Sequence, residues 1–96
     1  MSDKEVYQQK LQAELDEWKA ELDKLKAKAA VASADTKLKM NQQVEALESK
    51  IEEGKMKLSE LAKASDEAWE SIKEGVESAW KSLKSAFSDA ASKFKD

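Results

Sequence analysis

Several residue types that usually direct folding or chemistry are missing from this chain of 96 residues. Cysteine is absent, which excludes disulfides and thiolate sites. Histidine is absent too, which removes the usual general base and imidazole metal ligand. There is no proline, and the only glycines are Gly54 and Gly75, so nothing in the sequence forces a turn. These absences favour long helices and argue against an enzyme.

Positive charge comes from lysine alone. The chain has 17 lysines, no arginine and 20 acidic residues, for a net charge of −3. Because nucleic-acid affinity depends on dense cationic contacts, we expect no nucleic-acid partner. The longest purely apolar run, 29–32, is far too short to cross a membrane, and the opening residues have no apolar core typical of a secretory signal. We therefore expect a cytosolic, cytoplasmic protein, with a membrane surface as the alternative location.

Helix-forming and charged residues dominate the composition. Ala, Glu, Lys and Leu make up 54 of the 96 residues, which is typical of coiled coils and long helices. Leu, Ile, Val and Phe together number only 17, so an isolated chain has little apolar area to bury. The composition predicts an all-α protein whose folding depends on a second copy, another partner or a surface.

An apolar seam runs along residues 3–64. Its spacing alternates between four and three residues from Leu11 to Leu25, as in a heptad coiled coil, and then lengthens to an eleven-residue period. We call this set the assembly seam, and we expect it to pack against a second copy of the chain or to fold back as a hairpin. Its members are Leu11, Leu15, Trp18, Leu22, Leu25, Leu47, Ile51, Leu58 and Leu61.

Residues 66–95 continue the same pattern with more serine and more aromatic residues. The copies AWESIKEGVES (68–78) and AWKSLKSAFSD (79–89) follow one another at the eleven-residue period. Eleven residues make three helical turns at about 3.67 residues per turn, so each row of the repeat falls on one stripe. One row contains Leu58, Trp69, Trp80 and Ala91. We call the apolar set the tail stripe, and its members are Trp69, Ile72, Val76, Trp80, Leu83, Phe87 and Phe94.

Two interpretations of the tail stripe stay open. Most apolar helical stripes pack against another helix, and this interpretation is favoured. Bulky aromatic residues with lysines along one flank, here Lys73, Lys84 and Lys95, also suit a helix that lies among lipid headgroups. Residues 68–96 carry five lysines against five acids, so apolar area rather than charge should dominate whatever the stripe binds.

These patterns predict an all-α chain that forms one helical unit over residues 1–96. We expect a long helix over 3–64 and a second over 66–95, arranged as a coiled-coil rod or a helical hairpin. The alternative is three near-equal helices with breaks at 32–35 and 64–66, folded as an antiparallel bundle. At the first break large apolar residues become rare, although the alanines there favour helix. The second break is marked by a capping serine followed by two acids.

The sequence assigns no catalytic, cofactor-binding or metal-binding residue. Acid pairs such as Glu52 and Glu53 are typical of a solvated helix face, and no glycine-rich phosphate loop is present. A rod offers no walled pocket in which a lysine could become a base. We therefore expect neither an enzyme nor a small-molecule substrate.

Three segments carry a resemblance to known proteins: YQQKLQAELDEWKAELDKLKAKA (7–29), ASAD (32–35) and AWESIKEGVESAWKSLKSAF (68–87). Through them the chain resembles a group of small bacterial coiled-coil proteins, sometimes described as stress-inducible, which implies a helical rod without catalytic residues. The eleven-residue period is also similar to that of exchangeable apolipoproteins and late-embryogenesis-abundant proteins. That likeness implies binding to lipid surfaces or protection of cells during water stress. The Leu- and Trp-rich repeats, however, depart from the Ala/Thr/Lys-rich pattern of the protective proteins.

We therefore expect a non-enzymatic, stress-related structural or interaction protein that forms homo-oligomers through the assembly seam. The alternative is a protein that binds a lipid or membrane surface reversibly through residues 66–95.

Overall fold

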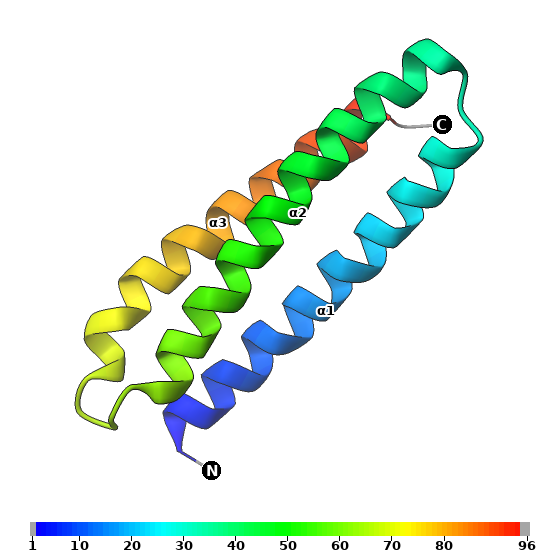
Figure 1. Cartoon of the computed structure of the whole chain (residues 1–96). Coiled ribbons are helices and arrows are strands. Elements are labelled where there is room, and N and C mark those ends of the chain that lie inside the picture. Colours follow the sequence, from blue (N-terminus) through cyan, green and yellow to red (C-terminus); the bar gives the residue numbers. More distant parts are fainter. Residues whose placement is uncertain (1, 95–96) are drawn as a thin grey trace.

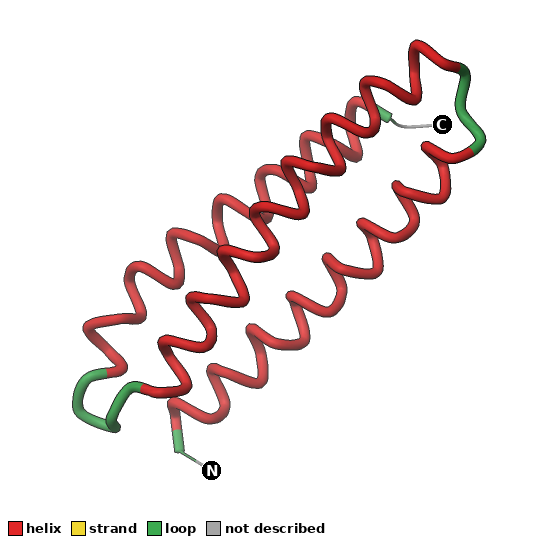
Figure 2. The backbone as a smooth tube through the Cα atoms, viewed as in Figure 1, coloured by secondary structure: helices red, strands yellow, loops and turns green. Residues whose placement is uncertain are grey.

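The computed structural model describes residues 2–94, and within this range the chain forms three α-helices and no strand. Helix α1 spans Asp3–Ala30, α2 spans Ala34–Lys63 and α3 spans Trp69–Lys93. Each helix runs antiparallel to the one before it, so α1 and α3 point in the same direction (Figure 1). The result is a rod of 52 × 20 × 18 Å with its two turns at opposite ends (Figure 2).

The all-α prediction is confirmed, and the arrangement is the antiparallel three-helix bundle. The expectation of one continuous helix over 3–64 is wrong, because the chain turns back between α1 and α2. Folding back lets the seam residues of the two helices bury one another within one chain, and each large apolar side chain buried contributes about 1.5–3 kcal/mol. This gain exceeds the cost of the few helical hydrogen bonds that the turn interrupts.

The turn between α1 and α2 is short and held by local bonds. The backbone N–H groups of Val31 and Ala32 each donate to a carbonyl three residues earlier, at 3.3 Å. The Ser33 hydroxyl donates to the Thr36 hydroxyl at 3.1 Å. Val31 is 87% exposed, so it adds no packing to the turn. The predicted break at 32–35 is present and begins one residue earlier than expected.

The turn between α2 and α3 covers residues 64–68 and is built around one side chain. The Ser65 hydroxyl oxygen accepts from the Ala68 N–H at 3.1 Å, and its carbonyl oxygen accepts from the Trp69 N–H at 3.0 Å. Because these bonds close residues 66–68 into the turn itself, α3 begins three residues later than expected. The predicted break at 64–66 is confirmed, and the predicted helix end at Lys95 lies outside the described residues.

Lys4 ties the start of α1 to the end of α2. Its Nζ atom donates to the carbonyl oxygens of Ala62, at 3.1 Å, and Ala64, at 2.5 Å. The last carbonyls of a helix have no intrahelical partner and carry partial negative charge, so a lysine is favourable there. The end of the bundle that holds the second turn is therefore fastened by polar contacts from two helices.

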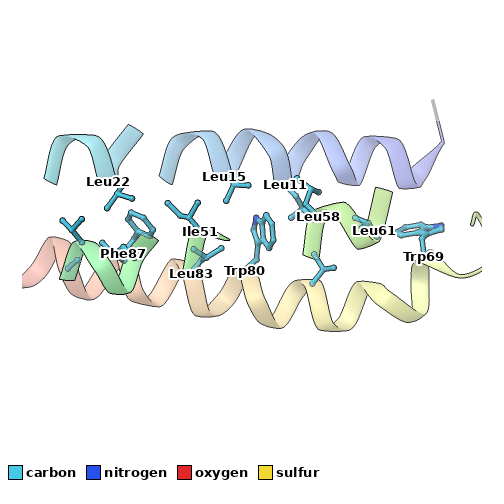
Figure 3. Packing of buried hydrophobic residues seen from close by; sticks show 14 residues of the cluster. Leu11, Leu15, Leu22, Ile51, Leu58, Leu61, Trp69, Trp80, Leu83 and Phe87 are labelled. Carbon is cyan, nitrogen blue, oxygen red and sulfur yellow. The ribbon is translucent and has the colours of Figure 1, made fainter. Parts of the chain in front are cut away.

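The core is apolar throughout the described residues, none of whose polar or charged side chains is buried. Its most enclosed side chains come from all three helices and are Leu15, Leu47, Leu61, Val76 and Leu83. In Figure 3 the labelled side chains of α1 and α3 converge on a shared interior, with Trp80 reaching from α3 toward α1. The bundle is thus closed by apolar burial rather than by internal polar pairing.

Gly54 gives α2 a close approach to both of its neighbours. It is buried, and a Cβ atom added there would lie 2.9 Å from Leu83 Cδ1 on α3 and 3.4 Å from Leu15 Cδ1 on α1. At Gly75, on the exposed side of α3, a Cβ atom would meet nothing within 4 Å. The first glycine therefore serves packing, whereas the second only lowers helix propensity.

We predict that alanine at these two positions has opposite effects. Gly75→Ala should raise the free energy of unfolding by about 0.5–1 kcal/mol through helix propensity alone. Gly54→Ala has the same propensity gain but must displace the enclosed Leu83, and overpacking of this kind costs about 1–3 kcal/mol. Urea denaturation followed by circular dichroism measures both variants. Equal stabilisation by the two alanines would show that α2 does not need the glycine for its close contacts.

Candidate functional site

The assembly seam lies inside the bundle of a single chain. Trp18 and Leu25 are half-buried at its edge, and the other members are buried in the same apolar cluster. The residues predicted to hold two copies together therefore hold three helices of one copy together. Their role between chains stays a prediction, and any such role requires the bundle to open or to exchange helices.

The tail stripe is also turned inward. Ile72 and Phe94 are half-buried, and the remaining members are buried against α1 and α2. The stripe therefore packs on other helices in the closed bundle, as the favoured interpretation expects. Contact with a lipid surface would require α3 to separate from the bundle.

Aromatic side chains bridge α1 and α3, whose backbones approach each other less closely than either approaches α2. The Tyr7 and Trp69 ring centroids lie 6.0 Å apart. Trp18 lies 6.1 Å from Trp80 and stacks on Phe87 at 6.1 Å with an interplanar angle of 18°. Such pairs contribute about 0.5–1.5 kcal/mol beyond the area that they bury. Rings from both parallel helices therefore meet across their interface.

Tyr7 lies in a small polar cluster at the edge of this interface. The Lys73 Nζ atom lies 5.1 Å from the Tyr7 ring centroid and 5.7 Å from that of Trp69, and it pairs with the Glu77 carboxylate at 3.9 Å. Partial burial raises the pKa of the Tyr7 phenol above 10.0, and the Glu77 carboxylate beside it and the charge of Glu14 raise it further. Each of these effects favours the neutral phenol.

The Trp80 indole is the one buried side chain in residues 2–94 with a polar atom that lacks a partner. The residue is 6% exposed, and its Nε1–H meets no acceptor in the bundle. A buried donor without a partner costs about 1–3 kcal/mol. The apolar ring thus gains from burial while its N–H is left without an acceptor, which makes burial of Trp80 less favourable than that of a purely apolar side chain.

A hollow of about 360 Å³ opens between α1 and α3 near the first turn. Its apolar lining comes from all three helices and comprises Leu25, Leu47, Phe87, Ala90, Ala91 and Phe94. Glu21, Lys24 and Lys28 of α1 line it as well. A second hollow of about 370 Å³ adjoins it, sharing Lys28 and Phe94 and adding Met40 and Lys93.

Comparison with known proteins gives no relative from which a site could be transferred, because no family model, curated protein or solved structure matches the chain. Within residues 2–94, carboxylates do not gather in groups of three that would hold a metal ion. None of the three helices in that range combines the length and hydrophobicity needed to cross a membrane. The candidate sites are therefore the hidden apolar surfaces and the hollows beside them.

The sequence pattern predicts neither the aromatic bridge nor the hollow. Tyr7 and Trp18 fit the apolar pattern of the first helix, but periodicity does not specify that their rings meet Trp69 and Trp80. The signal for the hollow was present in the repeat, where Ala91 follows Trp69 and Trp80 at the eleven-residue period. The replacement of tryptophan by alanine at position 91 indicates a hollow only if these three residues face α1, and the repeat alone does not specify which helix they face.

We predict that Tyr7, the chain's single tyrosine, ionises at a higher pH in the folded protein than in urea. Its folded-state pKa is raised, so its contribution to stability is fully present below pH 10.0 and is lost as the pH rises through the folded pKa. The ultraviolet absorbance of the phenolate reports this titration directly. Glu77→Gln should lower the folded midpoint, and Tyr7→Phe is the blank. Identical midpoints in buffer and in urea would contradict the assigned environment.

Proposed function

We propose that the protein is a non-enzymatic structural protein that assembles with a second copy of itself by exchanging α1. The observation that carries this proposal is the turn between α1 and α2. It joins helices that share one seam, yet it contains neither glycine nor proline, and no residue in the described chain has a positive φ. Nothing in its backbone geometry therefore prevents these residues from continuing as helix.

Exchange preserves the contacts that close the bundle. If the turn straightens, α1 and α2 become one long helix, and α1 of each copy packs in the groove that α1 of the other has left. The seam residues then bury the same area, and the Lys4 contacts with the end of α2 form between copies. Only the local bonds of the first turn are lost, which is why exchange of identical elements is a low-cost route to dimers.

The two turns differ in how strongly they resist straightening. The first turn has an exposed valine, Val31, and its Ser33 hydroxyl donates a local bond to Thr36 at the start of α2. Alanines flank Ser33 on both sides, and alanine is the best helix former. At the second turn Ser65 bonds to Ala68, and Lys4 adds contacts from α1. These differences support exchange at the first turn, with the second turn intact.

We predict that the protein forms dimers as its concentration rises and that Ala34→Pro suppresses them. Position 34 begins α2, where proline is tolerated, and Ser33 before it already has the extended conformation that proline requires, with φ −62° and ψ 160°. In a continuous helix the same proline costs about 3 kcal/mol. Light scattering after refolding at several concentrations measures the mass.

The matched variant for this experiment is Ser33→Ala, which removes the Ser33–Thr36 hydroxyl bond and adds helix propensity at the turn, and which should therefore increase the dimer fraction. A hydrogen bond of this kind contributes about 0.5–1.5 kcal/mol at most. If Ser33→Ala and the unaltered chain both stay monomeric throughout, exchange does not occur. Dimers that persist in Ala34→Pro would instead place the association on an external surface.

A second candidate function, reversible binding of a lipid surface through the tail stripe, is favoured by the unsatisfied Trp80 N–H. At a lipid–water boundary an indole keeps its ring in an apolar environment while its N–H finds acceptors. Lys73 and Lys84 on α3 can extend toward water beside it. A lipid surface would supply the hydrogen-bond acceptor that the core does not offer to the Trp80 N–H.

If the tail stripe binds lipid, we predict that brominated acyl chains quench a chain whose only tryptophan is Trp80. That variant carries Trp18→Phe and Trp69→Phe, and its indole is shielded in the closed bundle. Vesicles of brominated phosphatidylcholine should reduce its emission more than soluble acrylamide does. The matched control retains Trp18 as the only indole. Emission from Trp80 that vesicles leave unchanged excludes this candidate and leaves the exchange proposal standing.

A further inference from the structure

The hollow between α1 and α3 has a definite cause in the repeat. In the row Trp69, Trp80 and Ala91, each tryptophan places an indole between the two parallel helices, where Trp69 meets Tyr7 and Trp80 meets Trp18. The third position is alanine, which is exposed and has no ring to contribute. The row therefore fills the interface twice and leaves it open at the third repeat, where the hollow lies.

The shape and lining of this hollow suit a narrow apolar chain. Half-buried Leu25 on α1, buried Leu47 on α2 and half-buried Phe94 at the end of α3 all line it. Its volume of about 360 Å³ falls within the usual range for ligand pockets, about 300–1,000 Å³. The adjoining hollow shares Phe94 and Lys28 with it and is also lined by Val31 and Ala32 of the first turn.

The charges beside the apolar lining are mainly positive. Lys24 and Lys28 line the first hollow and Lys93 the second, against the single carboxylate of Glu21. An apolar groove with ammonium groups along its edge is complementary to a molecule with a long apolar body and one negative end. The larger hollow between α1 and α2, of about 450 Å³, is lined by glutamines, serine and lysines as well as leucine and lacks this separation.

We propose that the hollow binds one free fatty-acid anion, with its alkyl chain between Leu25 and Phe94 and its carboxylate beside Lys24 and Lys93. This inference goes beyond the proposed assembly and does not depend on it. It is also compatible with the expectation of no small-molecule substrate, because the ligand is held and undergoes no reaction. Apolar burial supplies most of the affinity, and the lysines select a negative head group.

The test is a calorimetric titration of the full chain with dodecanoate, kept below its critical micelle concentration, at protein concentrations where the mass is that of a monomer. We expect saturable binding of one anion per chain. Ala91→Trp restores the indole to the repeat and should weaken binding at least tenfold, whereas the control Ala20→Trp adds the same ring to an exposed position of α1 and should leave binding unchanged. Lys24→Glu with Lys93→Glu should weaken dodecanoate but not dodecanol.

The unaltered chain provides a test that does not depend on how the variants fold. Amide chemical-shift changes during the titration should concentrate in residues 21–28 and 87–94. Absence of saturable binding, equal affinity in Ala91→Trp and Ala20→Trp, or shift changes centred on the groove between α1 and α2 would each overturn the proposal. Binding of several anions per chain without saturation would show adsorption to the surface and would overturn it as well.

Discussion

The rest of this structure depends on one interaction, the burial of apolar side chains in a core that contains no polar pair. Every buried side chain of the core in residues 2–94 is apolar, so the hydrogen bonds and ion pairs that join helices, such as those of Lys4 and Lys26, lie outside the core. Apolar attraction is non-directional and follows area. Shape therefore supplies the specificity, through the close approach at Gly54 and through the rings that separate α1 from α3.

This constraint is the physical basis of the assemblies that we propose. A core held by area alone is equally satisfied by a helix of the same chain, a helix of a second copy or another apolar phase, provided that the area is similar. The turns decide among these states because they carry the few polar contacts that differ between the two ends of the bundle. The shape of the core thus selects how the helices pack, and the polar contacts of the turns would select between the closed and the exchanged arrangement.

The sequence predicted which residues are buried better than it predicted what buries them. The heptad and eleven-residue spacings identified Leu11, Leu22 and Val76 as members of apolar stripes, and all are core residues. Periodicity reports the face of a helix but not the chain that covers it, so a hairpin, a bundle and an oligomer share one pattern. The first turn was predicted only as the alternative, because Val31 and its neighbours carry no glycine or proline, and tertiary burial makes a turn there favourable.

An odd number of helices also determines how the fold responds to tension. The described chain starts at one end of the rod and finishes at the other (Figure 1). A force applied through Ser2 and Phe94 therefore acts along the helix axes. It slides α1 and α3 past one another, so the ring contacts from Tyr7 to Phe87 are strained together rather than peeled apart in sequence. Shear of this kind distributes load over the whole length, which makes the bundle stiffer lengthwise than a two-helix hairpin pulled from its adjacent ends.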